Sequence, residues 1–307
     1  MRETPPLWTL AALPVALVVL ALAAASFDHV LAARQAGHGG LAHAAAGPLR
    51  EAARLLVQSR RTTFASDRLL LRAGVVSLPV AASLAAVVVP LGDVAVADPL
   101  VGVVWFNAME VVVWASVWLA GWGPDSAYAL VGGYRFLAQG LAYELPHMFA
   151  LITAAVGAGS LRVSEVAAAQ DGLWFAVWMP VAFGVLLLSV LAMAFWGPFG
   201  QPVAADVSGG AMAELTGVDR LVFLAGRSAL LVVGAAVAVA LFLGGGAGPL
   251  LPPGAWMAAK VAVVLAVLVW AGRRLPPVRM DRFAQFAWVV LIPVSLLQLL
   301  VVSIVVL

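Results

Sequence analysis

Cysteine is absent from this chain of 307 residues, and charged residues are scarce. Without cysteine, disulfide bridges and thiolate metal sites are excluded. Charged residues make up 10% of the chain, against roughly 25% in an ordinary water-soluble domain. Most of the surface must therefore face something other than water. The net charge of +2 is too small to indicate nucleic-acid binding, so the expected class is a membrane-embedded protein.

Long apolar stretches dominate what is present. A membrane-spanning helix needs about 20 mostly apolar residues, and eight stretches meet that length. The period-two alternation of a membrane β-strand is absent from them. We therefore expect an all-α polytopic membrane protein forming a single transmembrane domain over residues 1–307. The eight expected helices are 7–26, 70–91, 99–121, 141–159, 173–196, 221–244, 255–272 and 284–306.

The first of these stretches, residues 7–26, has an alternative interpretation as a secretory signal peptide. The alanines at positions 23–25 are compatible with a cleavage site. However, the apolar core of a signal peptide is shorter than a membrane-spanning helix. We expect the stretch to be retained as the first transmembrane helix.

Arginine is distributed unevenly among the connections between these helices. The even connections hold only Arg162 and the N-terminal tail holds only Arg2. Because arginine and lysine are enriched in cytoplasmic loops, we expect the odd connections in the cytoplasm and both termini on the other side. The arginines of the odd connections are Arg34, Arg50, Arg54, Arg60, Arg61, Arg68, Arg135, Arg220, Arg273, Arg274, Arg279 and Arg282.

The first connection contains an amphipathic segment, residues 44–61. At helical spacing, Leu49 and Leu56 lie on one face, whereas Arg50 and Arg54 lie on another. Such a pattern is typical of a helix that lies in the membrane interface. The alternative is an ordinary solvated connector. We expect an interfacial helix on the cytoplasmic side.

Ionisable residues at membrane depth are hypotheses for function by default, because each costs about 2.5–3.5 kcal/mol on insertion scales. Glu110 lies midway along the third expected helix. Glu144 and His147 lie near the start of the fourth, one turn apart, and Arg227 lies inside the sixth. A buried carboxyl group can take up and release protons. The alternative is a carboxylate that pairs with an arginine only to hold helices together.

Motifs for soluble cofactors are absent: the chain has no Walker loop, dinucleotide fingerprint, nucleophile elbow or HExxH. His147 has no second histidine at ligand spacing, so we expect it to be packed and hydrogen-bonded rather than bound to a metal. No metal site is expected. Redox chemistry, if it occurs, must come from a partner.

Four ordered sets of residues carry a resemblance. They resemble the H-subunit family of bacterial NADH-quinone oxidoreductase, the membrane component of respiratory complex I at the junction with the peripheral arm. The family is also related to the membrane component of group 4 hydrogenases. The sets are Gly121-Trp122, Tyr128-Ala129-Leu130, Arg135, Ala138-Gln139 and Tyr143-Glu144, like GW, YAL, R, AQ and SYE; Ala158-Gly159-Ser160-Leu161, like AGSL; Trp270, Leu275-Pro276, Arg279, Asp281, Trp288 and Pro293; and Pro48-Leu49, Glu51, Arg54 and Asp67-Arg68.

The fifth connection departs from this family. The family usually reads ETNRxPFDLPEAESEL there, whereas residues 193–208 read MAFWGPFGQPVAADVS. Met193 and Trp196 stand where a glutamate and the arginine usually stand. Asp206 is the replacement for the last acid of the run, and Glu214 matches the family's EYSG. The chain is therefore a divergent member on this interpretation.

The resemblance implies a membrane subunit that forms or borders the quinone site and begins the proton-translocation path. It implies quinone as substrate, menaquinone or ubiquinone, with iron–sulfur clusters and flavin only in partner subunits. It also implies other membrane and peripheral subunits as partners, in the cytoplasmic membrane of a bacterium. The implied relay and quinone-site residues are Glu144, Glu214, Asp206, Glu51, Asp28 and Tyr143 with Arg135 as counter-charge; the implied contacts to the peripheral arm are Arg54, Arg68, Arg279 and Asp281.

Two alternatives remain open. The loss of carboxylates from residues 193–208 favours a membrane anchor of a related hydrogenase or of a degenerate complex I paralogue, with weak or no quinone chemistry. A stand-alone transporter with a midplane site at Glu110, Glu144 and Arg227 is the other, and the absence of an inverted repeat counts against it.

Overall fold

The computed structural model describes residues 7–37, 40–204 and 209–307, and within them it is helical without strands. Seven of the described helices are long and apolar enough to cross a membrane. This confirms an all-α polytopic membrane protein. The seven are α1 (Trp8–Gln35), α4 (Arg68–Ala86), α5 (Gly102–Trp122), α6 (Ala127–Ala158), α10 (Gly217–Phe242), α11 (Pro253–Arg274) and the continuous run of α12 and α13 (Met280–Val306).

The fifth expected helix, residues 173–196, forms as two pieces. A single turn, α8 (Phe175–Trp178), is followed by α9 (Pro180–Met193). Pro180 lacks an amide hydrogen and disfavours helical geometry in the residue before it; Met179 accordingly has φ −120° and ψ 51°. The prediction of one uninterrupted helix is wrong here, because the proline starts a new one.

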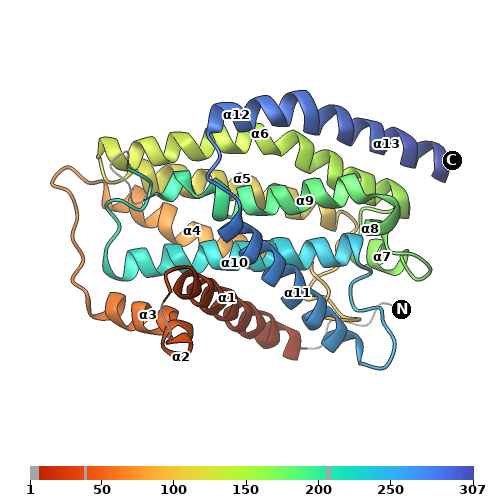
Figure 1. The fold of residues 1–307 in the computed structure, drawn as a ribbon, viewed down its shortest axis with the longest axis horizontal. Helices are drawn as coiled ribbons and strands as arrows, with labels where there is room; N and C mark the ends of the chain where they lie inside the picture. Colours follow the sequence, from red (N-terminus) through yellow and green to blue (C-terminus); the bar gives the residue numbers. More distant parts are fainter. Residues whose placement is uncertain (1–6, 38–39, 205–208) are drawn as a thin grey trace.

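The successive long helices alternate in direction through the bundle (Figure 1). The beginning of α1 and the end of α13 point toward the same end of the molecule, where α7 (Val163–Ala168) and α8 also lie. The first, third and fifth connections gather at the opposite end. These three connections therefore share one end of the fold, named here the arginine-rich end, as the alternation of helices requires.

Two expected boundaries differ in ways that move candidate residues. α1 continues past residue 26 to Gln35, so Asp28 lies on a helix and not in a connection. α6 begins at Ala127 instead of residue 141. Arg135 is thus inside a helix, and Glu144 lies near its middle. At 1.5 Å per residue, the 32 residues of α6 exceed the apolar thickness of a bilayer, so its first turns extend beyond the apolar core.

The amphipathic segment forms two helices, α2 (Leu41–Ala45) and α3 (Gly47–Val57). Pro48 near the start of α3 suits a helical first turn, and Gly47 lies so close to His29 that a Cβ there would meet the His29 Cγ at 3.1 Å. The helix ends at Val57, earlier than the expected residue 61, because Gln58 is extended. On the apolar face of α3, Leu55 is fully buried.

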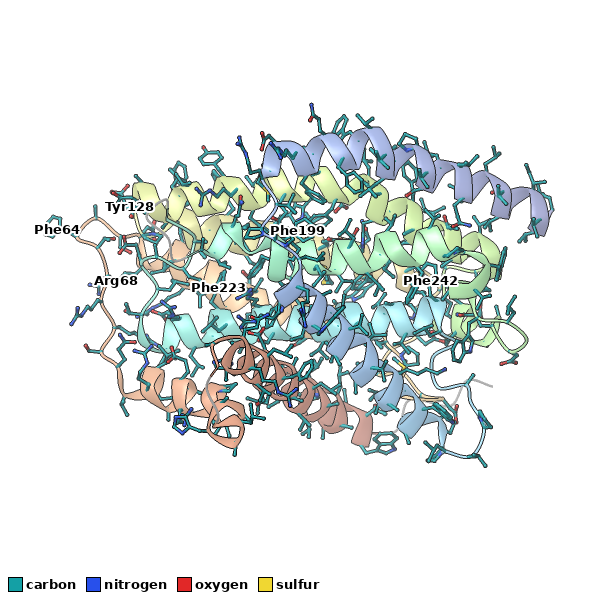
Figure 2. The ribbon with its side chains drawn as sticks, viewed as in Figure 1. Phe64, Arg68, Tyr128, Phe199, Phe223 and Phe242 are labelled. Atoms are coloured by element: carbon teal, nitrogen blue, oxygen red, sulfur yellow. The ribbon has the colours of Figure 1, made fainter. Side chains whose placement is uncertain are left out.

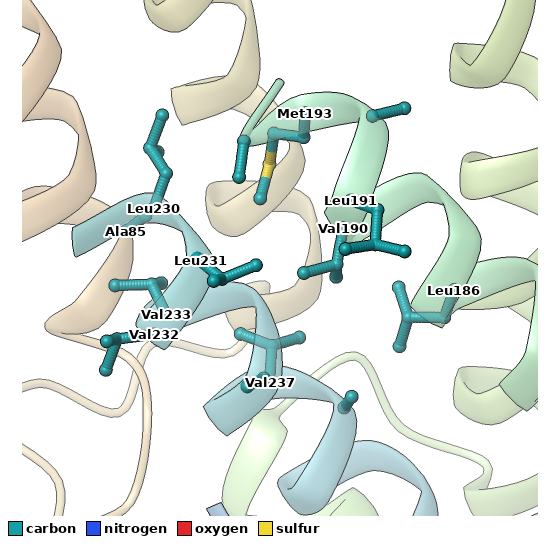
Figure 3. Close-up of a cluster of buried hydrophobic side chains, with 14 of the residues drawn as sticks. Ala85, Leu186, Val190, Leu191, Met193, Leu230, Leu231, Val232, Val233 and Val237 are labelled. Carbon is teal, nitrogen blue, oxygen red and sulfur yellow. The ribbon is translucent and has the colours of Figure 1, made fainter. Parts of the chain in front are cut away.

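α10 is the centre of the bundle and packs against α1, α3, α4, α9 and α11. Its face toward α9 is lined by small and branched apolar side chains. Figure 3 shows Val190 and Leu191 of α9 facing Leu231 and Val237 of α10. By contrast, α1 and the α12–α13 run are the least buried spans, so they present broad apolar faces to lipid.

α4 and α5 pack together over most of their length. A Cβ at Gly74 would lie 2.7 Å from the Ser116 carbonyl oxygen, so the glycine is required for contact between the backbones. One turn on, the Ser77 and Ser116 hydroxyls are 2.8 Å apart. The Asp67 side chain caps α4 by accepting from the amides of Leu69 and Leu70, the usual N-terminal arrangement.

Candidate functional site

Two groups of polar residues lie inside the bundle. The first, named here the acid cluster, consists of Glu110 on α5 and Tyr143, Glu144 and His147 on α6. The Glu110 Oε2 lies 3.3 Å from the His147 Nε2, and both side chains have no exposed surface. The Tyr143 hydroxyl accepts a hydrogen bond from Trp114 Nε1 at 3.3 Å, and its ring centroid lies 6.5 Å from that of His147. Several polar groups thus meet in the apolar interior.

Glu144 lies one turn before His147 on α6 and is only half-buried. Its Oε1 accepts a hydrogen bond from Asn107 Nδ2 at 3.2 Å. Asn107 precedes Glu110 by one turn of α5. Sequence reasoning missed Asn107, although an amide three residues before a glutamate in an apolar run was a usable signal.

His147 was expected to be packed and hydrogen-bonded. It is completely buried, against Phe106 and Tyr143. Its Nε2 approaches Glu110, but neither ring nitrogen makes a hydrogen bond within the described residues. Within the same residues no group of three His, Cys, Asp or Glu side chains comes together to hold a metal ion. The polar contact of His147 is therefore with a single carboxylate, that of Glu110.

The second polar group lines a cavity of about 400 Å³, named here the lateral cavity. α1, α3, α4 and α10 form its walls, together with Trp196. Most of the wall is apolar: leucines, valines, alanines and prolines. Its polar lining residues are Asp28, His29, Glu51, Ser83, Arg227 and Ser228. A mostly apolar pocket with a few polar groups is the usual form of a small-molecule site.

Arg227 is held rigidly in this wall. Its Nη2 donates to the Phe195 carbonyl at 2.8 Å and its Nε to the Ala194 carbonyl at 3.4 Å. The guanidinium carbon lies 4.6 Å above the Trp196 ring, a cation–π distance. The two carbonyls are those left free where α9 ends, so α10 supplies the cap of α9.

The two carboxylates of the lateral cavity are each paired with an arginine. Asp28 forms a bidentate ion pair with Arg273 at the end of α11, which ties α1 to α11. Glu51 accepts from Arg54 one turn on, at 2.6 and 2.8 Å. That hydrogen bond lowers the pKa of Glu51 below its ordinary value. Sequence reasoning did not single out Arg273 as a site residue, because its partner is 245 positions away.

Gln139 of α6 contacts the end of α9, next to the carbonyls that Arg227 binds. The Gln139 side chain on α6 is fully buried and donates to the Ala192 carbonyl at 2.6 Å. Ala192 lies two residues before the first carbonyl that Arg227 binds. Gln139 lies one turn before Tyr143 on α6. Aromatic rings fill the rest of this region, with Phe195 in contact with Phe136 and Phe223.

The remaining predicted site residues lie outside both groups. Glu214 accepts a hydrogen bond from the Ser126 hydroxyl at 2.9 Å, and Arg135 donates to the Gly209 carbonyl at 2.8 Å. The structure does not join either to the acid cluster. Asp206 lies outside the described residues.

The predicted contacts to a peripheral arm are exposed. Arg68 begins α4 at the arginine-rich end, the same end at which Figure 2 labels Phe64. Arg279 and Asp281 pair with each other at 3.2 Å, with side chains 71% and 64% exposed. Arg54 is likewise at the surface. Their exposure is compatible with contact to a partner, which leaves their role a prediction.

The altered fifth connection is compact where the structure describes it. Gly197–Phe199 and Gln201–Val203 form single 3₁₀ turns. Pro198, Phe199 and Pro202 are buried, and the Pro198 carbonyl accepts from the Val278 amide at 3.0 Å. Apolar packing thus occupies positions where the resemblance would place carboxylates.

Comparison with known proteins identifies the family. The family model described as NADH dehydrogenase matches residues 8–303. An H subunit of the NADH-quinone oxidoreductase of Geobacter sulfurreducens is 38% identical over 207 residues, covering 67% of this chain and 63% of that protein. One of Cereibacter sphaeroides is 39% identical over 211 residues, with 68% and 66% covered. One of Rhodopseudomonas palustris is 34% identical over 257 residues, with 82% and 80% covered.

The matched region therefore spans slightly less than two thirds of the Geobacter and Cereibacter proteins. The family model covers nearly every described helix, since it reaches from the start of α1 to within four residues of the C-terminus. The polytopic helical fold, the ordered motifs and these matches agree: the chain belongs to the NADH dehydrogenase family, with the H subunits of NADH-quinone oxidoreductases as its relatives.

Proposed function

We propose that this chain is the membrane subunit of a complex I-type NADH:quinone oxidoreductase and that the lateral cavity receives the quinone. The single observation that carries the proposal is the lining of that cavity. Its apolar residues suit an isoprenoid tail, while its polar residues suit a ring with two carbonyl oxygens. Membership of the family, with NADH-quinone oxidoreductase components as relatives, supplies the quinone as the substrate class.

The position of the cavity fits a substrate that arrives from lipid. α1 is one of the least buried spans, and it separates the cavity from the surroundings of the bundle. α3, the amphipathic helix, forms another wall. A helix with one apolar and one charged face lies at the membrane surface. A quinone would thus pass between an interfacial helix and a lipid-facing helix, at the arginine-rich end.

That end faces the cytoplasm in this proposal, because arginine is enriched in cytoplasmic loops. Both termini then lie on the non-cytoplasmic side of the bacterial inner membrane. The exposed residues Arg54, Arg68, Arg279 and Asp281 would meet the peripheral arm. That arm would carry the flavin and the iron–sulfur clusters, since this chain contributes no cysteine ligand.

The acid cluster is the proposed start of the proton path. A carboxyl group in a membrane interior is costly to keep charged, so a change of charge nearby changes its proton occupancy. Glu110 and His147 are close enough to share a proton, and Tyr143 and Glu144 extend the cluster along α6. Gln139 and the end of α9 connect it with the lateral cavity. In this proposal Glu214, Asp206 and Arg135 act at the cytoplasmic end.

A membrane anchor with little quinone chemistry is the second candidate function. The observation in its favour is the fifth connection, where Pro198, Phe199 and Pro202 are packed in place of a run of acids. In that case the partner subunits would be those of a hydrogenase or of a degenerate paralogue. The cavity would then be a packing defect filled with lipid.

Purification through a tag on this chain, followed by mass spectrometry of the co-purifying proteins, tests the proposal. A NADH-oxidising module, iron–sulfur subunits and antiporter-like subunits would support a complex I-type assembly. Hydrogenase components would instead support the second candidate. A folded, monodisperse chain recovered alone would contradict both and favour a transporter.

A further inference from the structure

Arg227 is the arginine that lines the lateral cavity, and neither carboxylate of the cavity forms an ion pair with it. Asp28 is paired with Arg273 and Glu51 with Arg54. Among the residues that the structure describes, no carboxylate lies within ion-pair distance of the Arg227 guanidinium. A charge that is buried in an apolar wall without a counter-ion is expensive. Its environment must therefore stabilise it by other means or receive an electron-rich ligand.

Part of that stabilisation is visible. The carbonyls of Ala194 and Phe195 occupy Nε and Nη2, and the rings of Trp196 and Phe195 lie 4.6 and 5.5 Å from the guanidinium carbon. Nη1 makes no hydrogen bond to any described residue. A guanidinium offers five N–H donors, so two remain at Nη1 on a side chain that lines the cavity.

The restraint of Arg227 matters for binding. Its side chain is fixed by two hydrogen bonds and an aromatic face, so little rotamer entropy is left to lose when a ligand arrives. The two carbonyls and the rings direct part of the guanidinium into the protein. The remaining donors at Nη1 belong to the polar part of the cavity lining.

We infer that Arg227 is the residue that binds the head group of the quinone, with Nη1 donating to a ring carbonyl oxygen. This rests on the proposed function of the lateral cavity. Arg227 would hold the ring at the end of α9, where Gln139 and then the acid cluster follow. The anionic phosphate of a membrane lipid offers the same acceptor chemistry. However, a lipid head group lies at the water interface, whereas Trp196, which contacts the Arg227 guanidinium, has only 7% of its surface exposed.

The experiment uses the complete complex, purified in mild detergent with added lipid. The probe is an azido-benzoquinone with a short isoprenoid tail, applied over a range of concentrations, photolysed and mapped by peptide mass spectrometry. Wild type is compared with Arg227→Met, Arg227→Lys and Ala225→Trp. Ala225 is an exposed alanine of the cavity wall, so the tryptophan tests the cavity itself.

Arg274→Met is the matched control. Arg274 also lies over an aromatic ring, 5.9 Å from the Trp270 centroid, but it is exposed and outside the cavity. Labelling is normalised to the amount of assembled complex. If Arg227→Met fails to assemble because the end of α9 loses its cap, Arg227→Lys decides the test, since it keeps the charge while losing the fixed fork of donors.

The expected result is labelling of α1 or α10 peptides in wild type and its loss in Ala225→Trp. Arg227→Met raises the half-saturating probe concentration by about tenfold or more, as expected for losing a hydrogen bond from a charged donor. Arg227→Lys raises it to a lesser extent. Arg274→Met matches wild type.

Two outcomes overturn the inference alone. Unchanged half-saturation in both Arg227 variants, with loss of labelling in Ala225→Trp, shows a quinone cavity in which Arg227 is only a helix cap. Displacement of the probe by phosphatidylglycerol in wild type but not in Arg227→Met shows that the arginine binds a lipid phosphate. No cavity labelling in wild type overturns the proposed function as well.

Discussion

Carboxyl groups have different partners in the lateral cavity and in the acid cluster. At the cavity, Asp28 and Glu51 are each paired with an arginine and lie near the surface. In the cluster, Glu110 is fully buried, and its nearest basic group is a histidine at 3.3 Å. Paired charges hold helices in position, and their protonation changes little. An acid beside a neutralisable base can exchange a proton. On the proposed function, the lateral cavity serves binding and the acid cluster serves proton transfer.

Arg227 belongs to the first region but contacts the backbone that leads to the second. The family pattern places an arginine at position 196, where this chain has tryptophan. In the structure the guanidinium of Arg227, from α10, lies on the Trp196 ring. A positive charge is thus present near that place, although it comes from a different helix. The lost carboxylates of residues 193–208 have no such replacement among the described residues of the segment.

The largest effect is expected from Glu110→Gln and Glu144→Gln. Each change removes a group that can exchange a proton while preserving its shape, so proton translocation by the complex in proteoliposomes should fall at least tenfold. Quinone-probe labelling of the lateral cavity should stay at the wild-type level. Asp171→Asn, an exposed carboxylate on another connection, is the matched control. Loss of labelling in Glu110→Gln would break the separation of the two regions.

Gln139→Leu tests the link between the regions and should have a smaller effect. The leucine preserves the volume but removes the hydrogen bond to the Ala192 carbonyl. Proton translocation per quinone reduced should fall by about threefold, consistent with a net loss near 0.7 kcal/mol for one neutral hydrogen bond. Probe affinity should not change. Wild-type coupling in Gln139→Leu would mean that the regions communicate by another route.

Asp28→Asn sharpens the structural side of the comparison. It breaks the ion pair that ties α1 to α11 and leaves Arg273 without its partner. We expect about 1.5 kcal/mol of destabilisation, typical of a hydrogen bond to a charged group, measured as a lower thermal midpoint of the complex. Asp281→Asn breaks an exposed pair and should have almost no effect. Equal destabilisation by the two variants would mean that the Asp28–Arg273 pair contributes no more to stability than the exposed pair.

The smallest effect concerns Glu51 and pH. Its hydrogen bond from Arg54 lowers its pKa below the ordinary value of 4.5. A carboxyl group whose pKa is lowered by folding stabilises the fold above its ordinary pKa and loses that contribution as pH falls through the lowered value. Protease cleavage next to α3 should rise less than twofold as pH falls below about 4.5, because exposed pairs contribute little.

Glu51→Gln provides the reference for that measurement. It should make the cleavage rate near α3 independent of pH in this range, because the titrating partner of Arg54 is gone. A steep pH response that persists in Glu51→Gln would assign it to another group.

The class of fold and most helices were predictable from the sequence because apolar length is a local property. The proximity of Glu144 and His147 was predictable for the same reason, since both lie on one helix. The contacts of Glu110 with His147 and of Asp28 with Arg273 were not, because they depend on how helices pack. Sequence reasoning also placed Glu144 near a helix start, because the polar residues of 127–140 concealed that α6 continues beyond the apolar core.

The lateral cavity was the part least accessible to sequence reasoning. Asp28, Glu51 and Arg227 come from three separate helices, and only the motif resemblance brought the first two forward. The helix break before Pro180 and the end of α9 at Met193 determine which backbone carbonyls are free to accept hydrogen bonds from Arg227. The role of Asp206, which lies outside the described residues, stays a prediction.

The most direct test of the account is an experimental structure of the purified complex with a quinone analogue bound. The account predicts density for the analogue in the lateral cavity, its tail along α1 and a ring oxygen within hydrogen-bond distance of Arg227 Nη1. A cavity occupied by side chains of a neighbouring protein of the complex, or an analogue bound only elsewhere, would contradict it.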